Sequence, residues 1–154
     1  MSLEVIAPGV LALLQDHGRF GMHRIGLTHG GPLEPEAFNT CRRLLGNRSG
    51  STAIEISFGG SHFRATLDTF FCVTGAGMPL AVNGVEKPLW AVHPLVAGDT
   101  IALGFAERGC RSYLGVADGF DIEPTFGSTA TVVRESIGGL GGDKRSGARH
   151  IRGR

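Results

Sequence analysis

The chain has 154 residues, of which 42% are hydrophobic and 19% charged, and these values are typical of one globular domain with its own core. The formal net charge of +1 at pH 7 excludes a strong electrostatic attraction to nucleic acid or to an anionic membrane, so we expect neither as a partner. The 25 glycines are too many for a helix bundle and favour a β protein rich in turns.

The first predicted elements are two short strands at Glu4–Ala7 and Val10–Gln15, separated by a Pro-Gly break. A polar, glycine-rich run follows and continues to residue 34. Connections in compact domains are usually about 4–6 residues long, so this length favours a functional loop. The only predicted helix comes next, in PEAFNTCRRLLGN at residues 35–47, with Pro at its first position and Gly-Asn at its end.

Beyond the helix the hydrophobic period changes to two, which predicts strands. Ile54 and Ile56 share one face and Glu55 lies on the other, and the stretch HFRATL alternates in the same way. The pair Asn83 and Gly84 is a strong hairpin signal, because both turn positions need a positive φ. About eight to ten short strands with one short helix predict a mainly β fold, either a closed barrel or a sandwich.

We expect the domain to cover residues 1–142. The last twelve residues, DKRSGARHIRGR, hold five basic residues and one acid. This composition predicts a basic, disordered tail at residues 143–154.

The cellular compartment can be inferred from the three cysteines and from the absence of long apolar stretches. Cys41, Cys72 and Cys110 are odd in number and far apart, which favours a reducing compartment over a disulfide framework. No stretch approaches the roughly 20 apolar residues of a membrane-spanning helix, and the start lacks the features of a secretory signal. We therefore expect a cytoplasmic protein.

The segment QDHGRFG, at the end of the second strand, is the first candidate site. It offers Gln15, Asp16 and Arg19 beside glycines that allow the backbone to approach a ligand. Asp16 and Arg19 either hold each other or clamp a polar substrate. The structural alternative is a turn in which Asp16 caps local N–H groups and Arg19 binds carbonyl oxygens.

The segment LTHGGPLEPEAF is the second candidate site. Gly30 and Gly31 lead into a helix whose first N–H groups are free, and such an end attracts a carboxylate or a phosphate. His29 and Glu34 stand beside it. The alternative is a plain glycine-rich entry to a capped helix.

Other signals exclude several kinds of chemistry. The six histidines never occur as HxH or HxxxH, so we predict no bound metal. Neither a phosphate-binding GK[ST] loop nor a GxSxG nucleophile motif is present. Cys41 and Cys72 lie in apolar segments and are predicted core residues. Arg111 and Tyr113 alternate with apolar residues along one strand, and they either line a cavity or cover a sheet face.

The stretches VIAPGVLALLQDHGRFG, GGPLEPEAF, AIEISFGG, RSYLGVADGFDIEPTFGS and GGLGG occur in the order found in one protein family. From about Val5 to Gly142 the sequence resembles allophanate hydrolase subunit 2, also described as biotin-dependent carboxyltransferase-like or as the C subunit of 5-oxoprolinase. The resemblance covers only the first of the two related lobes that longer chains of this family contain. It implies a cyclophilin-like closed β-barrel with one short α-helix.

The resemblance also implies an activity and partners. The chain would be a subunit of an ATP-dependent 5-oxoprolinase, or of a carboxyltransferase or allophanate hydrolase-type complex, acting on a small amide, lactam or urea-derived substrate. It would pair with a subunit-1 homologue, and ATP would act at the level of the complex. The chain holds no biotin-attachment motif. Without a second lobe we expect little activity alone and a tendency to form homo-oligomers through an exposed edge. The alternative is a non-catalytic regulatory subunit that pairs with a subunit-1 homologue and antagonises a kinase inhibitor.

The family motifs assign roles to individual residues. The motif QDxGRxG contains Asp16 and Arg19, the motif LEI contains Glu55, and GGxxD ends at Glu34, which replaces the usual Asp. Arg19 and the helix start would stabilise anionic charge, and either Asp16 or Glu55 would orient water or accept its proton. We expect a charged group near the helix start made of Asp16, Arg19, His29 and Glu34. The predicted catalytic residues are Asp16, Arg19 and Glu55, and the predicted substrate-binding residues are Gln15, His29, Gly30, Gly31, Glu34, Arg111 and Tyr113.

Overall fold

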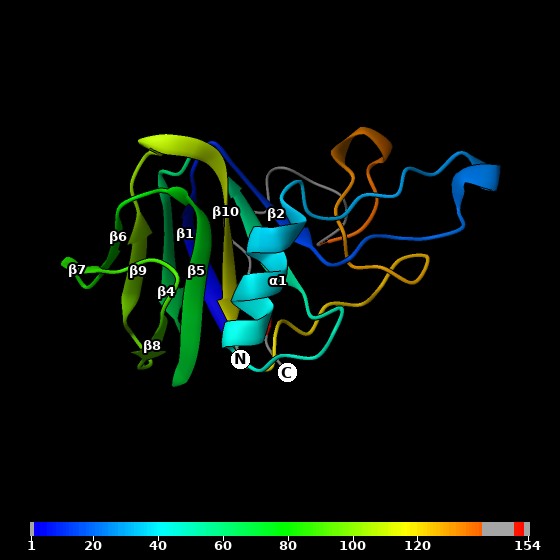
Figure 1. Ribbon diagram of the computed structural model, residues 1–154. Coiled ribbons are helices and arrows are strands. Elements are labelled where there is room, and N and C mark those ends of the chain that lie inside the picture. Colours follow the sequence, from blue (N-terminus) through cyan, green and yellow to red (C-terminus); the bar gives the residue numbers. More distant parts are fainter. Residues whose placement is uncertain (1, 140–149, 153–154) are drawn as a thin grey trace.

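The computed structural model describes residues 2–139 and 150–152, which form two antiparallel sheets and one α-helix (Figure 1). One sheet has six strands in the order β11-β1-β4-β9-β6-β7, and the other has five in the order β2-β3-β10-β5-β8. The strands of the first are β1 (Ser2–Pro8), β4 (Ser61–Ala65), β6 (Leu80–Val82), β7 (Val85–Lys87), β9 (Thr100–Leu103) and β11 (His150–Arg152). Those of the second are β2 (Leu11–Gln15), β3 (Ala53–Ser57), β5 (Thr69–Gly77), β8 (Val92–Leu95) and β10 (Arg108–Val116).

The main hydrophobic core lies between the two sheets. Alternate residues of each strand point into it, as β4 shows: Phe63 is buried, whereas His62 and Arg64 are exposed. Phe63 belongs to the same hydrophobic core as residues of the other sheet, among them Ile56 of β3 and Phe71 of β5. The alternation expected in the sequence therefore decides which face of each strand enters the core.

The helix α1 (Pro35–Leu44) covers the outer face of the five-stranded sheet and forms a second, smaller core. Phe38 and Cys41 of the helix pack against Cys72 and Tyr113. The helix can approach closely because a Cβ atom at Gly115 would lie only 2.8 Å from Cys41 Sγ. Both cysteines of the apolar segments are therefore core residues, as predicted.

The prediction of a mainly β fold with one short α-helix is confirmed for the described residues, but a closed barrel is not. Hydrogen bonding divides the strands into two separate sheets, so β7 and β11 remain edges of one sheet and β2 and β8 edges of the other. The Asn83 and Gly84 hairpin is confirmed, with positive φ values of 50° and 78° between β6 and β7.

The structure describes three residues of the predicted tail. His150–Arg152 form β11, which pairs with Ser2–Glu4 of β1. The exposed backbone groups of an edge strand favour such pairing. The rest of the tail, at 143–149 and 153–154, lies outside the described residues, and the domain boundary at residue 142 stays a prediction. None of the described helices is long and apolar enough to cross a membrane.

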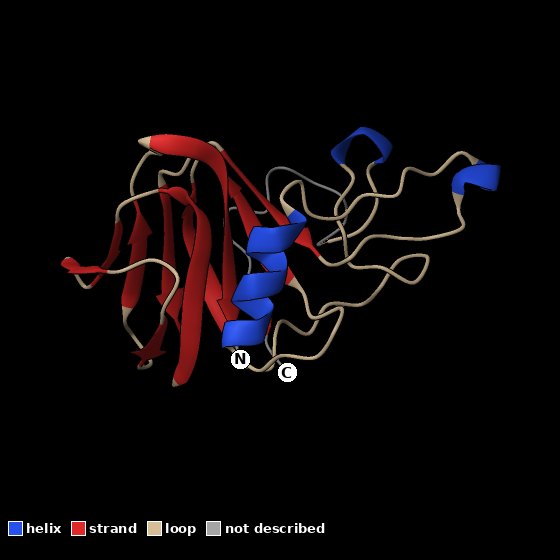
Figure 2. Ribbon diagram, viewed as in Figure 1, coloured by secondary structure: helices blue, strands red, loops and turns tan. Residues whose placement is uncertain are grey.

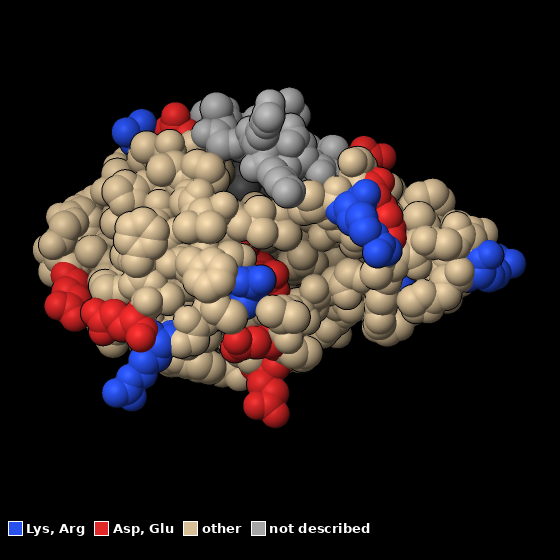
Figure 3. Space-filling model, turned by 90° about the horizontal axis from the view of Figure 1, so that it is seen from above, with Lys and Arg blue, Asp and Glu red and all other residues tan. Residues whose placement is uncertain are grey.

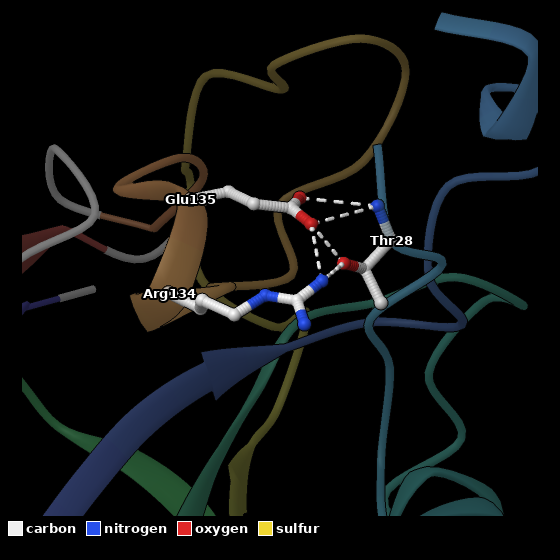
Figure 4. Close-up of polar contacts among 3 residues, drawn as sticks. All are labelled: Thr28, Arg134 and Glu135. Carbon is white, nitrogen blue, oxygen red and sulfur yellow. Dashed lines mark hydrogen bonds and ion pairs between the residues drawn. The ribbon is translucent and has the colours of Figure 1, made fainter. Parts of the chain in front are cut away.

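One end of the molecule consists mostly of loops (Figure 2). It contains the long run after β2, with the short 3-10 helix His23–Ile25, and a second 3-10 helix at Val133–Glu135. The two runs are tied together at Glu135, which accepts a hydrogen bond from the Thr28 N–H at 3.0 Å and another from the Thr28 hydroxyl (Figure 4). Arg134 also contacts both residues, each at 3.2 Å.

Candidate functional site

Asp16 lies at the end of β2 and holds a turn that is distant in sequence. Its Oδ1 atom accepts hydrogen bonds from the Gly18 N–H at 2.8 Å and the Ser128 hydroxyl at 2.5 Å. Its Oδ2 atom accepts one from the Thr129 N–H at 2.8 Å. Only 8% of the residue is exposed, so both oxygens are occupied inside the protein. The carboxylate therefore fixes this turn against the end of β2.

Arg19 binds the same distant segment, residues 125–131, by donating hydrogen bonds to backbone carbonyl groups of that segment. The Arg19 Nη2 atom donates to Ala130 O at 2.7 Å and to Ser128 O at 3.5 Å, and Nε donates to Thr125 O at 3.4 Å. The buried Nη1 atom has no acceptor among the described residues. The residue is 1% exposed and forms no ion pair with a described carboxylate. This geometry matches the structural alternative for QDHGRFG, in which Asp16 caps N–H groups and Arg19 binds carbonyls.

The structure brings only part of the predicted charged group together: the Arg19 N–H donates a hydrogen bond to His29 O at 2.7 Å. Among the described residues, no hydrogen bond or ion pair joins Asp16 or Arg19 with Glu34. Asp16 instead lines a cavity of about 570 Å³ between loops 46–52 and 118–129. Because its oxygens already accept three hydrogen bonds, it offers that cavity little further chemistry.

Glu55, Tyr113 and Arg111 form a separate polar group on the outer face of the five-stranded sheet. Glu55 in β3 lies opposite Tyr113 in β10, and Arg111 shares the face because it comes two residues earlier. The Tyr113 hydroxyl donates a hydrogen bond to Glu55 Oε2 at 2.8 Å. The Leu33 N–H donates to the same oxygen at 2.9 Å, and the Glu34 N–H donates to the Tyr113 hydroxyl at 2.8 Å. The pair is thus held against the entry to α1.

Burial keeps Tyr113 in its neutral form. The residue is fully buried, and this burial is the main reason that the pKa of its hydroxyl is raised above the usual value. The hydrogen bond from the Glu34 N–H lowers the pKa, whereas the hydrogen bond to Glu55 and its negative charge raise it further. Tyr113 therefore acts as a constant hydrogen-bond donor that orients the Glu55 carboxylate.

Arg111 and Glu55 leave hydrogen-bonding groups unused beside each other. Arg111 Nε lies 3.7 Å from Glu55 Oε1, which is an ion-pair distance but too long for a hydrogen bond. Arg111 Nε and Nη1 are buried without a hydrogen-bond partner, and no described residue donates a hydrogen bond to Glu55 Oε1. The guanidinium group also lies over the Phe58 ring, 5.7 Å from its centre. Buried donors without acceptors are unfavourable, so the described residues leave the hydrogen-bonding capacity of the Arg111 guanidinium partly unsatisfied.

A cavity of about 560 Å³ adjoins this polar group at the first turn of α1. Its walls include Glu34, Trp90, Arg108 and glycines of β5 and β10. Glu34 belongs both to the wall and to the hydrogen bond with Tyr113, so the cavity begins where the polar group ends. Its volume fits a small molecule.

The remaining predicted binding residues shape the loops. Gln15 donates a hydrogen bond to Thr131 O at 3.2 Å, and the His29 ring packs against an aromatic ring of the same loop. Gly30 and Gly31 have φ values of 67° and 93°, and a Cβ on Gly31 would lie 3.0 Å from a backbone oxygen. Any contact of these four residues with a substrate stays a prediction.

Sequence reasoning missed the partners of these groups. The segment 125–131, which binds both Asp16 and Arg19, appeared only as part of a family motif, although its run TFGSTAT is rich in small polar residues. The Leu33 N–H, which binds Glu55, carries no signal in the sequence because any residue but proline supplies it.

The charged side chains on the surface do not form one large patch on the face that Figure 3 shows. On the face shown in Figure 3, basic and acidic side chains occur in small mixed groups instead of one broad patch. Among the described residues, no group of three or more His, Cys, Asp or Glu could hold a metal ion. The face in Figure 3 therefore offers no broad basic surface to a polyanion.

Comparison with known proteins gives the family. Residues 25–150 match the family model described as carboxyltransferase domain, subdomain A and B. The chain belongs to this family. It is 34% identical to the C subunit of 5-oxoprolinase from Escherichia coli (strain K12) over 142 residues, which cover 91% of this chain and 45% of that protein. It is 31% identical to the urea amidolyase of Saccharomyces cerevisiae over 142 residues, 92% of this chain and 8% of that protein.

A solved structure supports the same assignment. The crystal structure of the Kluyveromyces lactis urea carboxylase matches with a TM-score of 0.95 and 30% identity, covering 98% of this chain and 14% of that one. The motif-based resemblance is therefore confirmed. The chain spans less than half the length of the relatives it matches.

Proposed function

We propose that this carboxyltransferase-family chain works as a component of a multi-subunit, ATP-dependent complex of the 5-oxoprolinase or urea carboxylase type. The support is family membership together with the similarity to the C subunit of 5-oxoprolinase and to urea amidolyase. We further propose that Glu55, Arg111 and Tyr113 bind a small amide, lactam or urea-derived substrate. ATP activates the substrate at the level of the complex.

The observation that carries this proposal is the unused acceptor at Glu55 beside unused donors at Arg111, 3.7 Å apart. An amide, a lactam and urea each present an N–H donor and a carbonyl acceptor on adjacent atoms. The N–H would donate to Glu55 Oε1, and the carbonyl oxygen would accept from Arg111. The pair of Glu55 and Arg111 thus matches the nitrogen and the carbonyl group that flank the reacting C–N bond.

The same placement gives each residue a chemical role. Negative charge develops on the carbonyl oxygen as the amide carbon is attacked, and the Arg111 guanidinium stabilises it in a partly buried setting. Glu55 orients the N–H or accepts a proton. Tyr113 fixes the Glu55 carboxylate, and Asp16 and Arg19 position the surrounding loops instead of touching the substrate.

The test is reconstitution of turnover with the purified other subunits of the complex from the same organism. We would follow 5-oxoproline-dependent and urea-dependent ATP hydrolysis with Glu55→Gln and Arg111→Lys variants. Each variant should lower turnover by about 100-fold while the melting temperature changes little. The controls are Glu4→Gln and Arg64→Lys, which alter an exposed ion pair on β1 and β4. Full turnover in both site variants would exclude this site.

A regulatory role is the second candidate, and one observation favours it. Two of the three predicted catalytic residues, Asp16 and Arg19, are engaged in structural hydrogen bonds. A regulatory subunit would bind its subunit-1 homologue tightly while no mixture of subunits turns over 5-oxoproline or urea. Substrate turnover that depends on Glu55 would rule it out.

A further inference from the structure

Phe58 is held in a backbone conformation that is strained for a bulky side chain. It directly follows β3, and its φ value of 61° lies in the left-handed region, which glycine adopts without strain. Both of its backbone groups are fixed, because the Phe58 N–H donates to Cys110 O and the Phe58 carbonyl accepts from the Ala106 N–H, each at 2.9 Å. Hydrogen bonds to β10 and to the segment before it therefore keep Phe58 in this conformation.

Burial does not explain why a phenylalanine stands at this position. The residue is 50% exposed, and it belongs to neither hydrophobic core of the described residues. Gly59 and Gly60 follow it with positive φ values, so a glycine would suit the same turn at position 58. Strained residues that persist in spite of this cost are concentrated at functional sites. The reason for an aromatic ring here lies in its contact with Arg111.

The Phe58 ring contacts the arginine of the polar group on the outer face of the five-stranded sheet. The Cζ atom of Arg111 lies over the ring, 5.7 Å from its centre, which is within the range of a cation–π contact. The other electrostatic contact of this guanidinium among the described residues is with Glu55, 3.7 Å away. An aromatic ring attracts the cation without supplying an oxygen acceptor, so Arg111 Nε and Nη1 keep no hydrogen-bond partner.

We propose that Phe58 is a positioning residue for the proposed amide, lactam or urea site: its ring fixes the Arg111 guanidinium and leaves two N–H donors for the carbonyl oxygen of the substrate. This inference rests on the proposed function. Arg19 shows the contrast, because it is fixed by carbonyl groups that use its Nε and Nη2 donors. An arginine that is fixed before the substrate binds also loses less conformational freedom on binding.

The first measurement follows the Arg111 Nε–H signal by NMR in the full chain, and it needs neither substrate nor partner subunits. The signal is assigned by its loss in Arg111→Lys. A ring next to the guanidinium shifts this signal, so Phe58→Leu and Phe58→Gly should both move it toward the signals of exposed arginines, whereas Phe58→Tyr should keep it in place. The matched control is Phe126→Leu, because Phe126 is 51% exposed with a φ of 51° and has no cation–π contact among the described residues.

The second measurement is 5-oxoproline-dependent and urea-dependent ATP hydrolysis in the complex assembled from purified subunits. Phe58→Leu and Phe58→Gly should each lower kcat about five- to tenfold with little change in KM, because the Arg111 guanidinium acts on charge that develops during the reaction. Phe58→Leu keeps the backbone strain and Phe58→Gly removes it, so an equal loss in both variants attributes the effect to the missing ring. Phe58→Tyr should restore turnover, and Phe126→Leu should not lower it.

Three results would overturn the positioning role. These are an Arg111 signal that stays in place without the ring, an unchanged kcat in both variants that lack the ring, and a loss of kcat in only one of them. The proposed function fails separately: if Arg111→Lys keeps full turnover while the Arg111 signal still depends on Phe58, the contact is real and the site is not catalytic. If Arg111→Lys loses turnover while Phe58→Leu changes neither the signal nor kcat, the site stands and Phe58 has no part in it.

Discussion

Arg19 and Arg111 are both removed from solvent to a large degree, yet their surroundings differ. Arg19 is 1% exposed and donates to three backbone carbonyls of one segment, so that only Nη1 lacks an acceptor. The Arg111 side chain is 21% exposed, and both Nε and Nη1 lack an acceptor although Glu55 lies 3.7 Å away. Arg19 therefore serves the fold, whereas the role of Arg111 in ligand binding is the one proposed above. The number of guanidinium N–H donors that lack an acceptor distinguishes the two arginines.

The largest expected effect is the loss of Arg19. Arg19→Ala leaves three carbonyls without their donor and opens a cavity, so we expect unfolding to become easier by about 3–5 kcal/mol. Urea denaturation measures this change. Arg24→Ala removes an exposed arginine of the same run and should stay within about 0.5 kcal/mol. A stable Arg19→Ala protein that assembles but lacks turnover would instead give Arg19 a catalytic role and break the comparison.

Asp16→Ala should destabilise the protein by somewhat less, about 2–3 kcal/mol. The substitution leaves the Gly18 N–H, the Ser128 hydroxyl and the Thr129 N–H without their acceptor. Asp68→Ala is the control, because Asp68 accepts one exposed backbone hydrogen bond, from Ala97. An equal effect of the two substitutions in urea denaturation would show that Asp16 does not hold the turn.

The Glu55 group predicts a dependence on alkaline pH. The pKa of Tyr113 is raised in the folded protein, so the unfolded chain loses this proton first, above its ordinary pKa of about 10. Stability is complete below that pH and falls above it, by up to about 1.4 kcal/mol for each pH unit. Tyr113 is the only tyrosine, so its near-ultraviolet phenolate absorbance should rise only with unfolding. Tyr113→Phe should remove this part of the pH dependence, and phenolate absorbance in the folded state would contradict the burial argument.

Local features of this fold could be predicted from the sequence. Pro35 at the helix start, the alternation in β4 and the turn at Asn83 and Gly84 depend on neighbours a few residues apart, and all three are confirmed. The choice between one closed barrel and two sheets depends on which strand edges meet. The pairing of β11 with β1 joins residues at the two ends of the chain, and composition alone could not show it.

The candidate site divides in the same way. Glu55, Tyr113 and Arg111 could each be selected from motifs, but their meeting depends on the register of β3 and β10 across 58 positions. The structural role of Arg19 depends on carbonyl groups 106 to 111 positions away. Every residue has a carbonyl group, so no side-chain pattern marks these acceptors.

The smallest expected effect concerns the contact between the two loop runs at Glu135. The hydroxyl and then the N–H of Thr28 are the main causes that lower the pKa of Glu135. Protection of the Thr28 amide against hydrogen exchange should therefore be complete above the ordinary glutamate pKa of about 4.3, and be lost as the pH falls through the lowered value. Glu135→Gln keeps an acceptor that cannot titrate, so it should remove this pH dependence while leaving the melting temperature nearly unchanged. Arg134→Gln is the control, because it removes a minor cause of the shift and leaves both Thr28 contacts in place. The opposite result, loss of protection in Arg134→Gln but not in Glu135→Gln, would show that Arg134 holds the two loop runs together. Two arginines, Arg19 and Arg134, would then stabilise the loop-rich end.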